Sequence, residues 1–134
     1  MRRAVVAYSL GVALVDLGDE EVLGVDVDPP VRDQPQVALP LVVTADAHGS
    51  RVVALVSRRP PLMVSDDAGT TWREAGAGLP PGRDVAISPE HPDSILFASE
   101  NRLFVSEDGG RFWRSLALEL NDIRAVAWDD EPRN

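Results

Sequence analysis

The sequence contains no cysteine and no lysine, and all 13 of its basic residues are arginine. Without cysteine the chain has no disulfide, no thiolate nucleophile and no cysteine-ligated metal. Without lysine it has no Schiff-base amine and no P-loop lysine. Aromatic residues make up only 5% of the chain. No apolar run approaches the roughly 18–20 residues of a membrane span.

The charge balance is acidic, with a formal net charge of −9. Nucleic-acid binding depends on clustered positive charge, so this composition argues against a nucleic-acid partner. A hydrophobic content of 44% is enough for a packed core, and the length predicts one domain, 1–134. Residues 1–15 have the basic-then-apolar order of a signal peptide, but Tyr8, Ser9 and Gly11 interrupt the run and no clear cleavage site follows. Cytoplasmic and extracytoplasmic locations therefore both stay open.

A short pattern occurs twice, 41 residues apart, and organises the chain. Both copies read Ser-x-Asp-x-Gly-x-x-Trp, and both follow an apolar run. A fixed period of this length is typical of repeat architectures, and the flanking runs predict two strands joined by a turn. The Asp is suited to accept backbone N–H groups, the Gly to take a positive φ, and the Trp to pack beneath the turn. The fixed positions are Ser65, Asp67, Gly69 and Trp72 in the first copy, and Ser106, Asp108, Gly110 and Trp113 in the second.

These two stretches resemble the Asp-box (BNR) repeat of β-propellers, which occurs in sialidases, sortilin-type receptors and photosystem II stability factors. The resemblance implies an all-β fold of propeller blades, each with four antiparallel strands, which we label A to D from the inside outward. In that family the Asp box is a structural turn, generally placed away from the catalytic centre. The resemblance therefore predicts the fold and leaves the activity open.

Strand patterns around the two turns divide most of the chain into blades. The clearest blade spans 81–120, and its strands A to D are predicted at Val85–Pro89, Ile95–Ser99, Arg102–Ser106 and Phe112–Leu116. The preceding blade spans 25–80, with its A strand at Val25–Pro29. An insertion at 31–50 separates that A strand from strand B. Long loops in compact domains are often functional, so the insertion is a candidate binding element.

The two ends of the chain predict one further blade between them. Residues 1–24 supply strands B, C and D, joined by a shortened Asp box at 17–20 that lacks its Trp. Residues 121–128 supply only an A strand. The strand order is therefore BCD-ABCD-ABCD-A, which amounts to about three blades.

Three blades are fewer than the roughly four to eight that close a propeller. Unpaired edges and bare apolar faces favour association, and two-fold dimers are the commonest closed assembly. We therefore expect a homodimer with a six-bladed ring, in which the A strand of one chain pairs with strands BCD of another. The residues expected at this strand-exchange interface are Val5, Ala7, Val126 and Trp128. The alternative is a segment of a longer propeller.

No residue pattern identifies a catalytic, metal or cofactor site. Paired carboxylates such as Asp66-Asp67 fit a turn better than a calcium loop, which needs about six to eight oxygen ligands. Sialidase-type catalysis requires an arginine cluster beside a Tyr–Glu pair, and the one tyrosine, Tyr8, has no Glu partner in the local pattern. The sequence favours a non-enzymatic binding or scaffold module for a protein or a glycan. A sialidase-like hydrolase fragment and a glycan-binding lectin remain the alternatives.

Overall fold

The computed structural model describes residues 2–29 and 34–129, and all regular structure in this part of the chain is β-strand. None of the described residues belongs to a helix long and apolar enough to cross a membrane. The strands are β1 (Arg3–Tyr8), β2 (Gly11–Asp16), β3 (Glu21–Val25), β4 (Val42–His48), β5 (Arg51–Val56), β6 (Leu62–Ser65), β7 (Arg73–Ala75), β8 (Gly82–Ile87), β9 (Ile95–Ser99), β10 (Arg102–Ser106), β11 (Arg114–Glu119) and β12 (Ala125–Trp128).

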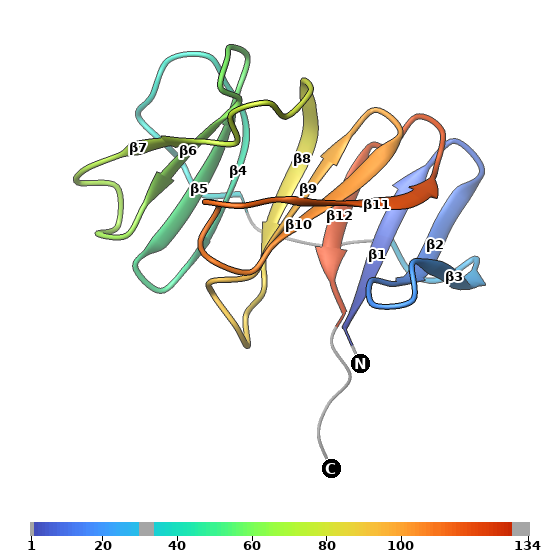
Figure 1. Ribbon diagram of the computed structural model, residues 1–134. Coiled ribbons are helices and arrows are strands. Elements are labelled where there is room, and N and C mark those ends of the chain that lie inside the picture. Colours follow the sequence, from blue (N-terminus) through green and yellow to red (C-terminus); the bar gives the residue numbers. More distant parts are fainter. Residues whose placement is uncertain (1, 30–33, 130–134) are drawn as a thin grey trace.

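The twelve strands form three antiparallel sheets of four strands each. Sheet 1 has the order β12-β1-β2-β3, sheet 2 the order β4-β5-β6-β7, and sheet 3 the order β8-β9-β10-β11. Sheet 3 lies in the middle, with sheet 2 on one side and sheet 1 on the other (Figure 1). Sheets 2 and 3 meet along β4, β5 and β8, whereas sheets 3 and 1 meet along β8, β9 and β12. The expectation of an all-β chain made of four-stranded antiparallel units is confirmed.

The last strand completes the first sheet within the same chain. β12 pairs with β1 in the register Ala4↔Trp128, Val5↔Ala127, Val6↔Val126 and Ala7↔Ala125. The expected exchange of this strand between two chains is therefore wrong for this structure. The physical reason is that β11 ends close to sheet 1. The turn that follows β11 brings the chain to the unpaired edge of β1, where β12 can pair. Backbone bonds from Ser9 N to Asn121 O (2.9 Å) and Arg124 N to Ala7 O (2.8 Å) fix this return.

The innermost strand of sheet 2 also differs from the prediction. It is β4 (Val42–His48), which lies inside the predicted insertion 31–50, and not Val25–Pro29. Val25 ends β3, where Asp26 takes a positive φ of 59° and Pro29 cannot donate to a ladder. Gly49, with φ of 60°, instead makes the tight turn that joins β4 to β5. Of the insertion, 31–33 lie outside the described residues.

Three hydrophobic clusters hold the sheets together. The first packs sheet 3 against sheet 1, and the second packs sheet 2 against sheet 3. Phe97 is fully buried in the second cluster, where its ring meets Phe104 (centroids 5.7 Å apart) and Trp113 (6.0 Å) edge to face. The third cluster lies on the face of sheet 2 that points away from sheet 3. The middle sheet is thus buried on both faces and each end sheet is packed by another sheet on one face only.

Two buried aspartates join the first strands of neighbouring sheets. The Asp46 carboxylate on β4 accepts the Ile87 N–H of β8 at 2.7 Å. The Asp84 carboxylate on β8 accepts the Val126 N–H of β12 at 2.8 Å. Both side chains are about 5% exposed, so each bond satisfies backbone that water does not reach.

Candidate functional site

The first Ser-x-Asp-x-Gly-x-x-Trp turn is closed by its own side chains. The Ser65 hydroxyl donates to Asp67 Oδ1 (2.8 Å) and accepts the N–H groups of Asp67 (3.3 Å) and Gly69 (2.8 Å). Asp67 in turn accepts the Thr71 N–H (2.8 Å) and the Thr71 hydroxyl (2.6 Å). Gly69 has a φ of 91°, which a residue with a Cβ adopts only under strain.

The second turn repeats this hydrogen bonding. The Ser106 hydroxyl donates to Asp108 Oδ1 at 2.8 Å and accepts the Gly110 N–H at 2.9 Å. Asp108 accepts the N–H groups of Arg111 (3.1 Å) and Phe112 (3.0 Å). The fixed Ser and Asp of both copies therefore direct their polar atoms into their own turn. These hydrogen bonds hold each turn in shape.

The same hydrogen bonds shift the titration of the two aspartates. Bonding from the side chain and then the backbone of Thr71 lowers the pKa of Asp67 from its ordinary 3.8 to about 2. The backbone N–H of Phe112 is the largest cause that lowers the pKa of Asp108. The turns thus stabilise the charged form of both carboxylates, which keeps them charged at a lower pH than an ordinary aspartate.

The two turn tryptophans have different surroundings. Trp113 packs into the cluster between sheets 2 and 3, and its indole N–H donates to the Gly110 carbonyl at 3.0 Å. Trp72 packs on the third cluster, at the face of sheet 2 that no other sheet covers. Equivalent positions of the repeat therefore lie in a closed joint in one case and at an end of the molecule in the other.

The shortened turn of sheet 1 gathers three acidic side chains. Asp16, Asp19 and Glu21 place carboxylate oxygens within 4.8 Å of one another. Asp16 Oδ1 already accepts the N–H groups of Gly18 (2.8 Å) and Asp19 (3.0 Å), so it takes the acceptor role that the Ser hydroxyl has in the full turns. Because Asp16 serves the turn and the other two are exposed, the cluster is a turn with solvated carboxylates.

Three arginines converge on the second full turn. Guanidinium nitrogens of Arg51, Arg73 and Arg111 lie 3.2–3.3 Å from the point where a Cβ on Gly109 would stand. Arg73 donates to the Gly109 carbonyl at 2.5 Å. Burial and the nearby charge of Arg111 lower the pKa of Arg73.

Acidic side chains and a backbone carbonyl already engage this arginine cluster. Arg51 pairs with Asp66 at 2.6 Å and with Asp93 at 3.1 Å, while Arg111 donates to the Asp108 carbonyl at 2.9 Å. Tyr8 lies elsewhere, against the cluster between sheets 3 and 1. The arrangement needed for sialidase-type chemistry, several arginines beside a Tyr–Glu pair, is therefore not assembled in the described part of the chain.

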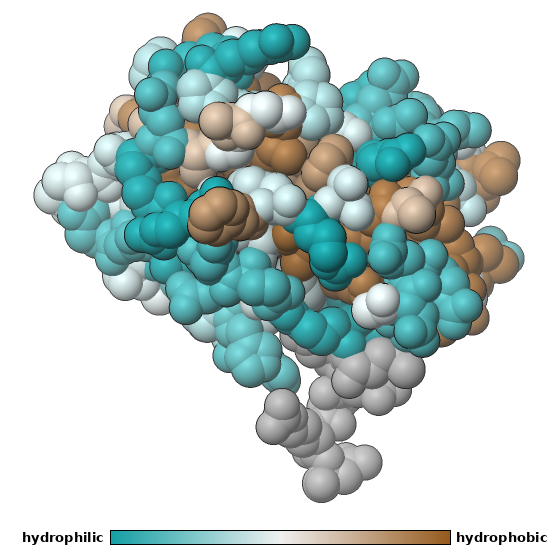
Figure 2. Space-filling view, viewed as in Figure 1, coloured by the Kyte–Doolittle hydropathy of each residue, from teal (hydrophilic) through white to brown (hydrophobic). Residues whose placement is uncertain are grey.

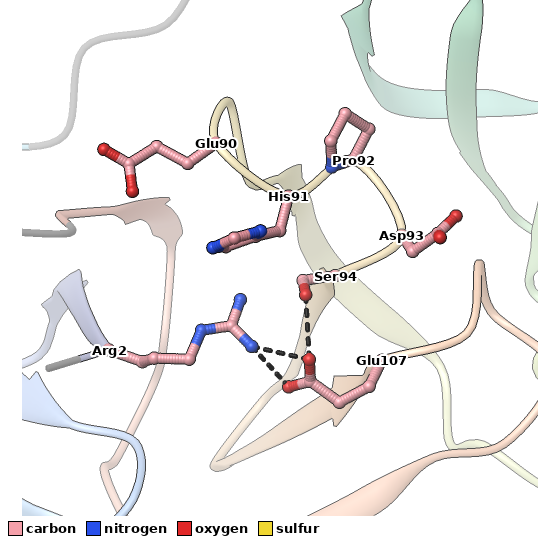
Figure 3. Close-up of a pocket in the computed structure, with 7 residues that line it drawn as sticks. All are labelled: Arg2, Glu90, His91, Pro92, Asp93, Ser94 and Glu107. Carbon is pink, nitrogen blue, oxygen red and sulfur yellow. Dashed lines mark hydrogen bonds and ion pairs between the residues drawn. The ribbon is translucent and has the colours of Figure 1, made fainter.

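A pocket of about 690 Å³ opens where the loop before β9 meets the start of sheet 1 (Figure 3). Arg2 Nη1 donates to both carboxylate oxygens of Glu107, at 2.6 and 2.5 Å, and Ser94 donates to the same carboxylate at 2.8 Å. The Arg2 guanidinium also lies over the Trp128 ring, 4.6 Å from its centroid. The pocket is lined by Arg2, Glu90, His91, Pro92, Asp93, Ser94 and Glu107. Since its one arginine is already neutralised and three acidic residues line it, it is poorly suited to an anionic ligand.

The four residues expected at an interface separate into two pairs. Val126 is buried in the cluster between sheets 3 and 1, and the Trp128 indole donates to the Ala86 carbonyl at 3.0 Å. These two therefore stabilise the single chain. Val5 and Ala7 point the other way and are half-buried on the outer face of sheet 1.

The outer face of sheet 1 is an apolar surface that none of the described residues packs against as a cluster. Its members lie in two cross-strand rows, Ala127–Val5–Leu14 and Ala125–Ala7–Val12, and all six are half-buried. At the edge strand β3, Gly24 stands opposite Leu14 and continues the first row. Figure 2 shows apolar surface on this side of the molecule. Exposed apolar surface of this kind is typical of association sites.

Comparison of the chain with protein-family models, curated proteins and solved structures found no match.

Sequence reasoning missed most of this outer face. The sequence places Val12 and Leu14 in a strand but does not show which face of the sheet they occupy. Ala4, Val6, Ala13 and Val15 alternate along their strands with the residues of the outer face. Because both sets of residues are apolar, this alternation does not show which set is buried. Only the packing of sheet 3 shows which set is covered.

Proposed function

We propose that the three sheets are consecutive blades of a β-propeller, that the chain is half of a ring, and that a second copy completes it as a non-enzymatic binding or scaffold module. The observation that carries this proposal is the uncovered outer face of sheet 1. It presents the pattern of side chains that, in the middle sheet, is buried by the next sheet.

The first support is that the two joints inside the chain are built alike. Arg73, the first residue of β7, donates to the Gly109 carbonyl in the turn of sheet 3. Arg114, the first residue of β11, donates to the Leu17 carbonyl in the turn of sheet 1 at 3.4 Å and pairs with Glu20 at 3.6 Å. Sheets 2, 3 and 1 therefore follow one another in the same sense, as successive blades of a propeller do.

The second support is the match between the forward faces of sheets 3 and 1. The forward face of a sheet is the one that points toward the next sheet in the order 2, 3, 1. In sheet 3, the row Ala86–Leu96–Val105 crosses the first three strands and is at most 3% exposed, because sheet 1 covers it. In sheet 1, the row Ala127–Val5–Leu14 crosses the same three strands in the same order. Its residues are half-buried because no sheet lies on them. A further sheet on this face would bury apolar area as the existing joint does.

The third support is a receiving face at the other end. In sheet 3, the row Val85–Phe97–Phe104 and Trp113 pack against sheet 2. The matching row in sheet 2 is Ala45–Ala54–Met63, with Trp72 beside it, and it points away from sheet 3. One chain thus has a forward face and a receiving face without a partner sheet. Two copies related by a two-fold axis satisfy both faces twice and close a ring of six blades.

The proposed contact between two copies differs in charge from the two contacts between sheets inside the chain. β3 begins with Glu21 where β7 and β11 begin with Arg73 and Arg114, so the arginine clamp is missing. Apolar contact must therefore supply most of the association energy, and the dimer should depend weakly on salt.

The alternative function, a sialidase-like hydrolase fragment, has less support. Around Gly109, Arg51 and Arg73 pair with acidic side chains and Arg111 donates to a backbone carbonyl, and Tyr8 is not beside them. We expect no cleavage of a fluorogenic sialoside, and turnover that resists further purification would favour the hydrolase. Binding of the dimer to a glycan array would identify the protein as a glycan-binding lectin.

The decisive experiment compares two acidic substitutions. Leu14→Glu puts a charge on the half-buried forward face, whereas Leu10→Glu puts one at the β1–β2 hairpin, where Leu10 is 83% exposed. Sedimentation velocity should show dimers for the native chain and Leu10→Glu, and a dissociation constant raised at least tenfold for Leu14→Glu. Equal dimerisation of all three, or monomers throughout, would reject this interface. Circular dichroism confirms that both variants are folded.

A further inference from the structure

The receiving face of sheet 2 is already partly occupied by the chain itself. Val37 and Leu39 are half-buried and pack against the third cluster, which contains Ala45, Ala54 and Met63. These side chains belong to the connection between β3 and β4. This connection joins sheet 1 to sheet 2, which lie on opposite sides of sheet 3. The connection therefore ends as a cover on the surface where the proposed function seats a second copy.

The side chains of sheet 2 leave room for this cover. Alanines stand at 45 and 54, where sheet 3 has Val85 and Phe97 in the same cross-strand row. The smaller side chains leave a shallow surface, and Val37 and Leu39 lie against it. The cover is thus matched to the receiving face in shape and polarity.

The cover has an apolar inner side and a polar outer side. Along residues 34–40 exposure alternates, with Pro35, Val37 and Leu39 half-buried and the residues between them exposed. The exposed set is Gln34, Gln36, Ala38 and Pro40. An apolar sheet face cannot bury itself favourably against the exposed Gln36 amide, because this amide would lose water without gaining a partner. A second copy therefore needs the cover to move.

The cover is also weakly held. Residues 34–38 make no backbone hydrogen bond with the sheet in the described part of the chain. Within the described residues, their side-chain bonding is limited to Gln34 Nε2, which donates to Thr44 Oγ1 at 2.8 Å. Two half-buried side chains and one side-chain bond are far less than the contact a whole sheet face makes.

We infer that residues 34–39 are an internal competitor for ring closure: they cover the receiving face in the single chain and are displaced by sheet 1 of a second copy. This inference rests on the proposed function and adds its regulation. The apparent dissociation constant equals the intrinsic one divided by the fraction of uncovered chains. Weakening the cover therefore strengthens the dimer, although it removes apolar side chains.

The test replaces the inner side chains in the double variant Val37→Ser/Leu39→Ser. Its matched control changes the outer side of the same segment, as Gln36→Ser/Ala38→Ser. Sedimentation equilibrium should show a dimer roughly tenfold tighter for the inner variant and unchanged for the control. Adding Leu14→Glu to the inner variant should raise its dissociation constant at least tenfold.

The outcomes separate the two claims. If the inner variant dimerises as the native chain does, or more weakly, and Leu14→Glu still breaks the dimer, the ring stands and the competitor is rejected. If Leu14→Glu leaves the mass of the inner variant unchanged, the ring itself is rejected. Faster proteolytic cleavage within 34–39 in the inner variant than in the control provides a second reading that does not depend on assembly.

Discussion

Sheets 3 and 1 carry nearly the same forward face, but only one of the two is covered. The row Ala86–Leu96–Val105 is buried under sheet 1, whereas Ala127–Val5–Leu14 is half-buried at the end of the molecule. The difference lies in the neighbour and not in the residues. In a repeat protein each unit packs against its neighbours. An uncovered copy of a covered face therefore indicates that a unit of the same kind would pack on it.

The largest effect expected from this comparison is on folding stability. Leu96→Ala removes a fully buried side chain from the covered face and should lower the free energy of unfolding by about 2–5 kcal/mol. Leu14→Ala on the uncovered face should lower it by less than about 1 kcal/mol in the monomer. Urea unfolding at low protein concentration measures both. Similar losses at the two positions would mean that the face of sheet 1 is packed after all.

The aspartate links between sheets provide a second, smaller effect. Asp84→Ala removes the acceptor of the buried Val126 N–H and should cost about 1–3 kcal/mol of unfolding free energy. Because β12 carries the intramolecular closure of sheet 1, hydrogen exchange should speed up first at Val126 and Ala127. If β12 instead stays as protected as β9, the link is not what holds the closing strand.

The smallest effect concerns the acid stability of the first full turn. The folded pKa of Asp67 is about 2, below its ordinary 3.8. Its contribution is therefore complete above about pH 4 and is lost as pH falls toward 2. Asp67→Asn should flatten the loss of stability between pH 4 and 2. Urea midpoints across this range measure the slope, and parallel profiles for native chain and Asp67→Asn would contradict the assignment.

The extent to which the sequence predicted this structure depended on how local each feature is. Strands around Ser65–Trp72 and Ser106–Trp113 could be placed because the turn residues and the apolar runs are adjacent. The first strand of sheet 2 could not, because Val25–Pro29 imitates a strand closed by proline while β4 contains Thr44 and Asp46. The turn at His48-Gly49 between two apolar runs was the available signal for β4.

The sequence correctly predicts that β12 pairs with the strand at residues 3–8, but it places the two strands in different chains. Strand periodicity shows that Ala125–Trp128 matches an innermost strand, and says nothing about whether β1 of the same chain is within reach. The same limit applies to the candidate interface. Val5 and Val126 are both apolar strand residues, and only the tertiary packing buries Val126 inside the chain while leaving Val5 on its surface.

The most direct measurement is the mass of the native chain in solution as its concentration is raised through the micromolar range. Sedimentation equilibrium should give a mass that rises from 14.5 kDa toward twice that value, while Leu14→Glu stays at 14.5 kDa. A mass of 14.5 kDa at every concentration, for both the native chain and the Val37→Ser/Leu39→Ser variant, would contradict the half-ring account.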